Sequence, residues 1–166
     1  RLILVDAAGP EFRPESVPLG LAIARLPLVS RVFEHLLPRA LVAASVASVY
    51  GDPTRVGAAT VDRYFELMLR AGNRRALAER LSQMVPGEDA ERIATIRQPT
   101  LILWGGRDRL IPPSTARAFA GMIPGSHLVV FDQLGHVPQE EDPALSVEPV
   151  RTFLGLASRA PLQTPA

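Results

Sequence analysis

Three short runs of apolar residues along the chain have the length and composition of buried β-strands. They are Leu2–Val5, Thr100–Trp104 and Leu128–Phe131, and each is followed by Asp, Gly or a cluster of turn-forming residues. Only a helical pattern, Ser114–Met122, separates the second run from the third. The last two runs are therefore predicted to form one β–α–β crossover with parallel strands.

The long interval between the first and second strands has the periodicity of helices instead. Apolar residues recur at i, i+3 and i+4, and breaks that contain Pro or Gly separate the segments. The predicted helices are Pro18–Arg25, Leu26–Leu37, Arg39–Val49, Thr60–Arg70 and Arg74–Met84. A further amphipathic helix is expected over Pro143–Leu156, with Pro149 breaking its middle.

This order of elements predicts how the chain is divided. Residues 1–15 are expected to be the first core strand and its exit loop, and residues 16–94 a helical insertion. Residues 95–156 are expected to form the C-terminal core and residues 157–166 a flexible tail. The chain opens at once on a buried strand pattern, which favours a piece cut from a longer protein. The edge of the first strand would then be open for self-association.

Composition narrows the functional classes. With 47% hydrophobic and 21% charged residues, the chain has the profile of a globular domain. Its 18 basic and 17 acidic residues are spread along the sequence, which argues against nucleic-acid binding. The absence of Cys excludes disulfides and thiolate metal sites. No apolar run approaches the roughly 20 residues that span a bilayer, so membrane insertion is not expected and the simplest location is cytoplasmic.

A candidate acid, Asp108, follows the second predicted strand. The strand runs into Gly105-Gly106, and these glycines are expected to let the backbone turn sharply so that Asp108 faces a cleft above the sheet. The carboxyl ends of parallel strands are where α/β proteins keep their sites. By itself, an Asp at this position could equally serve as a turn former or helix cap.

A candidate base, His136, lies just beyond the third predicted strand. Neighbouring parallel strands are about 4.8 Å apart, so their exit loops can bring this imidazole against the Asp108 carboxylate. A carboxylate that holds one ring nitrogen fixes the tautomer and stabilises the imidazolium formed when the other nitrogen takes a proton. The two residues therefore supply the acid and base of a catalytic triad. Trp104 is assigned to the core.

Two motifs carry a family resemblance. Residues 104–112 are Trp-Gly-Gly-Arg-Asp-Arg-Leu-Ile-Pro and residues 135–143 are Gly-His-Val-Pro-Gln-Glu-Glu-Asp-Pro. They resemble the acid and histidine loops of α/β-hydrolases, in the family's order and at its typical spacing. Residues 2–9 resemble the strand after the nucleophile helix, and the helical interval resembles the family's cap domain. The resemblance implies the C-terminal part of an α/β-hydrolase sheet, with three parallel strands, flanking helices and a helical cap insertion.

The resemblance also implies a nucleophile in a Gly-x-Ser-x-Gly elbow upstream. These 166 residues contain no such elbow, and none of their serines has the strand and glycines that one needs. The isolated chain is therefore expected to be inactive, as a non-catalytic fragment or a binding module. For the complete protein, the resemblance implies a cofactor-free hydrolase, most simply a carboxylic ester hydrolase. Epoxide hydrolysis, haloalkane dehalogenation and C–C bond hydrolysis on the same fold are the alternatives.

The expected substrate is a small, apolar, ester-like molecule. Phe33, Tyr64 and Met68 on the predicted cap helices are candidate residues to line its site. No metal site is predicted, because the acidic stretch Glu140–Asp142 is explained by a favourable interaction with the start of a helix.

Overall fold

A computed structural model of the chain describes residues 1–26, 36–85, 87–88 and 90–156. Three strands form one parallel sheet in the order β1-β2-β3, with β1 at Leu2–Val5, β2 at Thr100–Gly105 and β3 at His127–Phe131. This confirms the predicted set of three parallel strands. Within the described residues β1 pairs with β2 alone, and self-association through its other edge stays a prediction.

The central strand β2 is buried along its whole length, as its unbroken apolar run requires. Because side chains alternate between the two faces of a strand, its residues divide between two clusters. Ile102 and Trp104 pack with Phe119 of helix α7 (Pro113–Met122) on one face. Leu101 and Leu103 pack on the other face, which helix α9 (Pro143–Leu154) covers. The predicted β–α–β crossover is confirmed, with α7 between β2 and β3.

The prediction that Pro149 breaks the last helix is wrong. Helix α9 continues through this proline. A proline at this position removes one backbone hydrogen bond, to the carbonyl of Leu145 four residues earlier. Leu145 is 51% exposed, so water is near enough to replace the missing donor.

All but one of the remaining helices that the structure describes lie between β1 and β2 in the sequence. Most of them follow the predicted periodicity, although the prediction over Leu26–Leu37 falls mainly outside the described residues. Short helices that lack a long periodic pattern were not predicted. The elements are α1 (Leu19–Ala24), α3 (Arg39–Val49), the 3-10 helix η1 (Pro53–Arg55), α4 (Ala58–Leu69), α5 (Asn73–Ser82) and α6 (Ala90–Ile93), with the equally short α8 (Pro138–Glu141) after β3.

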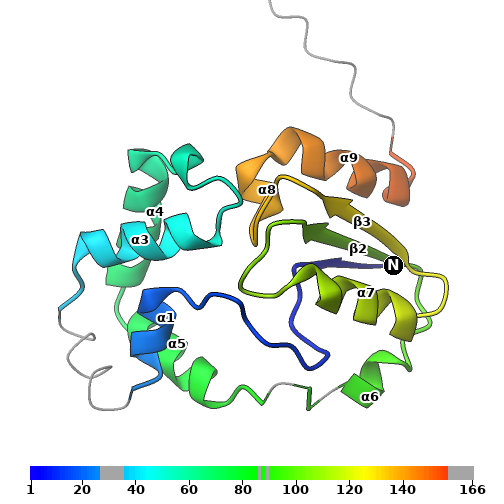
Figure 1. Cartoon of the computed structure of the whole chain (residues 1–166), viewed down its shortest axis with the longest axis horizontal. Helices are drawn as coiled ribbons and strands as arrows, with labels where there is room; N and C mark the ends of the chain where they lie inside the picture. The colour runs from blue at the N-terminus through cyan, green and yellow to red at the C-terminus, as the bar shows by residue number, and fades with distance from the viewer. Residues whose placement is uncertain (27–35, 86, 89, 157–166) are drawn as a thin grey trace, which may run out of the picture.

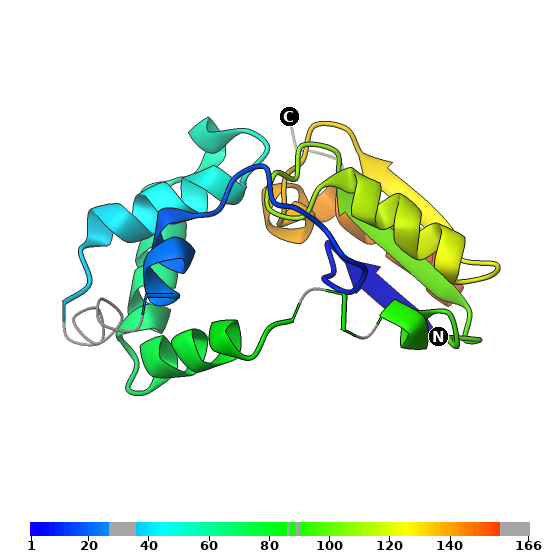
Figure 2. The same ribbon diagram turned by 60° about the horizontal axis from the view of Figure 1, so that its bottom comes forward.

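Helices α1, α3, α4 and α5 pack together as a helical layer with a small core of its own. Val42, Val46 and Tyr50 are its buried residues, and Tyr64 and Phe65 pack against them. The helical layer lies beyond the carboxyl ends of the strands, to the left of the sheet in Figure 1, and Figure 2 shows the same separation from another side. No helix in the described part of the chain is long and apolar enough to cross a membrane.

Candidate active site

The turn after β2 positions Asp108. Neither of its two glycines is among the residues with a positive φ angle, so this turn does not use the left-handed backbone conformation. Close backbone packing explains why both positions are glycine. A Cβ on Gly105 would overlap the carbonyl oxygen of Gly135, and a Cβ on Gly106 would lie 2.8 Å from the Cα of Asp132. The glycines therefore let the acid and histidine loops lie against each other.

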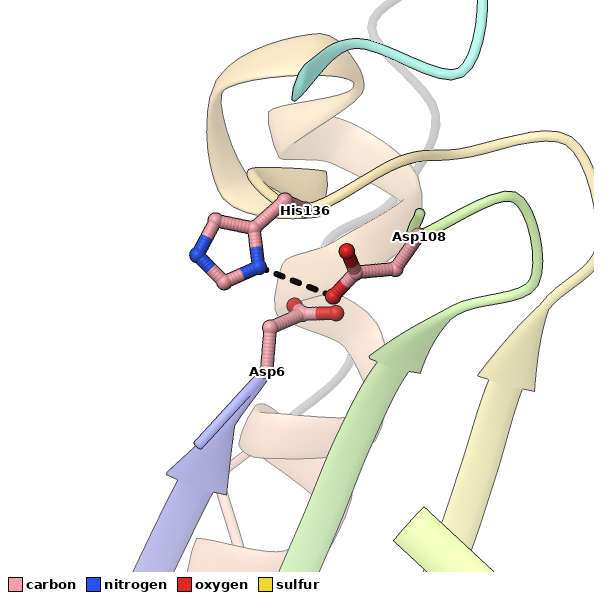
Figure 3. A group of neighbouring side chains, drawn as sticks. All are labelled: Asp6, Asp108 and His136. Carbon is pink, nitrogen blue, oxygen red and sulfur yellow. Dashed lines mark hydrogen bonds and ion pairs between the residues drawn. The ribbon is translucent and has the colours of Figure 1, made fainter. Parts of the chain in front are cut away.

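Asp108 makes hydrogen bonds through both carboxylate oxygens. Oδ1 accepts from the backbone N–H of Leu110 at 2.8 Å and of Ile111 at 2.9 Å, which is the turn-forming role that Asp often has. Oδ2 lies 2.8 Å from Nδ1 of His136 (Figure 3). The side chain of Asp108 has no exposed surface. The structure thus brings together the two residues that the motifs single out.

The loop that carries His136 is held by the helical layer. Its backbone N–H donates to the carbonyl of Val49, the last residue of α3, at 2.8 Å. Gly135 packs so tightly on the backbone around Gly51 that neither position has room for a Cβ. The imidazole is 22% exposed, and its Nε2 points away from Asp108 (Figure 3). A ring with one nitrogen fixed by a carboxylate and the other open suits a general base.

Asp6 joins this pair, although the sequence analysis did not select it. It is the residue after β1, it is 5% exposed, and its Oδ1 accepts from the backbone N–H of Gly105 at 2.9 Å. Burial, assisted by the nearby Asp108 charge, raises the pKa of Asp6 to about 9. The available signal was the same one that marked Asp108, a carboxyl group just past the end of a buried strand.

Asp6, Asp108 and His136 could in principle offer ligands to a metal ion. One donor atom from each lies within 4.8 Å of the others. Two of the three side chains are already joined by their own hydrogen bond, which acid–base chemistry explains without an ion. That no metal binds here stays a prediction.

A second missed residue, Glu141, supports the histidine loop from α8. It is 5% exposed and accepts from the backbone N–H of Gly135 at 2.7 Å and of Gly51 at 2.8 Å. Its neighbour Glu140 accepts from the hydroxyl of Tyr64 at 2.9 Å and pairs with Arg63 at 2.6 Å. Both glutamates lie in the first turn of α8, as the helix-dipole explanation requires, and in addition they bind specific groups of the histidine loop and of the helical layer.

The third acidic residue, Asp142, does cap a helix, since it accepts from the backbone N–H of Leu145 in α9. The glutamates also affect Tyr64. Burial first, and then the Glu140 carboxylate that accepts its hydroxyl hydrogen bond, raise the pKa of Tyr64 to about 12. This tyrosine therefore keeps its proton and remains a donor to Glu140 at neutral pH.

A cavity of about 260 Å³ opens within the helical layer. Two of the predicted lining residues, Tyr64 and Met68, are on its wall, whereas Phe33 lies outside the described residues. The rest of the lining is mainly aliphatic and includes Leu21, Val42 and Val46. Asp108 and His136 are not among its lining residues.

Comparison with known proteins gives consistent matches. The model of the Alpha/beta hydrolase family matches residues 1–148. An uncharacterized protein of Mycobacterium tuberculosis is 31% identical over 170 residues, which cover 93% of this chain and 48% of that protein. Lipase 1 of Psychrobacter immobilis is 35% identical over 75 residues, which cover 43% of this chain and 24% of the lipase.

Solved structures share the fold. A mutant meta-cleavage product hydrolase from Pseudomonas fluorescens IP01 superposes with a TM-score of 0.73 at 21% identity, over 93% of this chain and 55% of that one. The chain thus spans about half the length of the proteins it matches most fully. On the family match over residues 1–148, the chain belongs to the Alpha/beta hydrolase family.

Proposed function

We propose that the complete protein is a hydrolase in which His136 is the general base and then the general acid, and Asp108 orients it. The single observation that carries this is the 2.8 Å contact between His136 Nδ1 and Asp108 Oδ2. In this arrangement Nε2 removes a proton from a nucleophile and returns it to the leaving group. The Asp108 carboxylate stabilises the imidazolium between the two steps.

The nucleophile is a separate question. Among the described residues, no serine is hydrogen-bonded to His136. Because the chain spans about half of its relatives, we propose that an upstream Ser in a Gly-x-Ser-x-Gly elbow completes the triad. The 166-residue chain alone should then have no turnover that depends on His136.

Carboxylic ester hydrolysis is the proposed reaction. The similarity to a lipase over 75 residues supports it, and so does the aliphatic cavity beside Tyr64 and Met68, which suits an apolar acyl or alcohol group. C–C bond hydrolysis requires the same histidine and a Ser nucleophile, whereas epoxide and carbon–halogen hydrolysis require the histidine with an Asp nucleophile. A p-nitrophenyl ester, an epoxide, a haloalkane and a vinylogous diketone, assayed in parallel, separate these reactions.

The test compares variants of the complete protein with p-nitrophenyl butyrate. Asp108→Asn keeps the size of the side chain, but its amide places a donor against Nδ1 and favours the wrong tautomer. We expect kcat/KM to fall by about 10³- to 10⁴-fold for Asp108→Asn and for His136→Gln. The matched control is His127→Gln, since His127 is exposed at the start of β3. His136→Gln activity within tenfold of the unaltered protein would refute the assignment.

A further inference from the structure

Two buried carboxyl groups share the space next to one imidazole. Asp6 is 5% and Asp108 is 2% exposed, and an oxygen of each lies within 4.8 Å of the other and of a ring nitrogen of His136. Glu141 adds a further negative charge to the surroundings of Asp6. Two carboxylates cannot both be ionised at this distance in a buried site at low cost, so one of them holds a proton.

The hydrogen bonds decide which carboxyl group is neutral. Asp108 faces donors at both oxygens, two backbone N–H groups at Oδ1 and His136 at Oδ2. Among the described residues, Asp6 accepts a hydrogen bond from the Gly105 N–H at Oδ1 and from no other donor. Each donor favours the ionised form of the carboxyl group that it faces, which assigns the charge to Asp108 and the proton to Asp6.

The second oxygen of Asp6 is consistent with this assignment. Oδ2 is buried and has no hydrogen-bond partner among the described residues. An ionised oxygen there would lack any donor, whereas a protonated one becomes a donor itself. Figure 3 shows the Asp6 carboxyl group directly beside the Asp108–His136 pair.

The backbone holds Asp6 in this place. Its φ angle is +42°, a left-handed conformation that residues with a side chain seldom adopt. Its N–H donates to the carbonyl of Leu103 at 3.1 Å, which extends the pairing of β1 with β2 by one residue. This conformation turns the side chain from the sheet edge toward Asp108.

We propose that Asp6 is a positioning residue, a neutral carboxylic acid whose proton faces the Asp108 carboxylate and keeps it in register with His136. Asp6 does not touch a reacting atom in this proposal. Because Asp6 is neutral, Asp108 is the one carboxylate beside His136. The contact with Asp6 restrains the Asp108 side chain. The inference deepens the proposed function, but its first test needs no turnover.

Carbon-13 NMR of the 166-residue chain with labelled Asp tests the protonation state directly. The Asp6 carboxyl signal, assigned by its loss in Asp6→Asn, should keep the shift of a carboxylic acid from pH 5 to pH 8 and titrate near pH 9. A carboxylate shift at pH 6 would overturn the proposal. Because the titration is made on the unaltered chain and needs no turnover, an inactive protein does not affect the answer.

Variants of the complete protein then test positioning. Asn at position 6 can accept from Gly105 and donate to Asp108, as the neutral acid does, whereas Ala can do neither. We expect kcat/KM for Asp6→Asn to stay within about threefold with an unchanged acid limb of its pH profile, and for Asp6→Ala to fall by about tenfold or more. Asp132→Asn, at an exposed turn, is the matched control. A shift of the acid limb by about one pH unit in Asp6→Asn would mean that a charge was removed, and it would refute the proposal. Equal activities of the Asn and Ala variants would mean that Asp6 does not position Asp108, and they would refute it as well.

Discussion

The Glu141 carboxylate accepts a hydrogen bond from the backbone N–H of Gly135, the residue immediately before His136, at 2.7 Å. The same carboxylate accepts a hydrogen bond at 2.8 Å from the backbone N–H of Gly51, two residues after the end of α3. One buried side chain therefore joins the histidine loop to the segment that follows α3. The position of His136 thus depends on the helical layer as well as on the sheet.

Removal of this carboxylate should weaken the fold and the site together. In Glu141→Ala, one buried and one partly buried N–H group lose their acceptor, and we expect the free energy of unfolding to fall by about 2–4 kcal/mol. Glu141→Gln retains one acceptor oxygen but places an amide against the other N–H, so an intermediate loss is expected. Urea unfolding curves of the chain measure both. Glu66→Gln, exposed on α4, is the control, and equal stabilities of the two Gln variants would contradict this role.

The close contact between Gly105 and Gly135 makes a second prediction. Gly105→Ala would drive its Cβ into the backbone of the histidine loop, and we expect a loss of about 3 kcal/mol in the free energy of unfolding. Gly121→Ala is the matched control, because this glycine is exposed in α7 and nothing lies within 4 Å of its added Cβ. The free energy of unfolding of that variant should rise by about 0.5–1 kcal/mol, because Ala has a higher helix propensity than Gly. Thermal or urea unfolding distinguishes the opposite signs.

The buried acid Asp6 should make stability fall as the pH rises. Its pKa is raised from 3.8 to about 9, so between these values the folded chain binds more protons than the unfolded chain. The stabilisation linked to this proton is complete below about pH 4 and is lost as the pH approaches 9. Between about pH 6 and 8, the free energy of unfolding of the unaltered chain should fall by up to about 1.4 kcal/mol per pH unit relative to that of Asp6→Asn. Urea unfolding over this range checks it, and stability curves that run parallel would contradict it.

The cavity in the helical layer predicts a dependence on substrate length. Met68→Trp adds volume to its wall, and we expect the complete protein to lose about tenfold or more in kcat/KM for p-nitrophenyl octanoate, with little change for the acetate. Leu69→Trp is the control on the same helix, since Leu69 is 50% exposed and is not part of the cavity wall. Equal losses for the two esters would place the acyl group elsewhere.

Elements with a long periodic pattern were predicted well from the sequence. The helix Arg39–Val49 has the predicted bounds, because its periodicity reflects one buried face that holds Val42 and Val46. The strand Leu2–Val5 also has the predicted bounds, because an unbroken apolar run marks it without any periodicity. The short helices α6 and α8 have too few residues for a periodicity. The path of α9 through Pro149 also could not be predicted, because it depends on which carbonyl reaches water.

The sequence by itself determined the family motifs, the parallel direction of the strands and the selection of Asp108 and His136 as a candidate acid and base. Only the tertiary structure decided that Asp6 lies beside them and that Glu141 ties their loop to the helical layer. The reason is physical: a motif records what is close along the chain, whereas Asp6 is 99 residues from Gly105 and Glu141 is 90 residues from Gly51. Such carboxyl groups show their roles only when the folded backbone brings donors to them and excludes water.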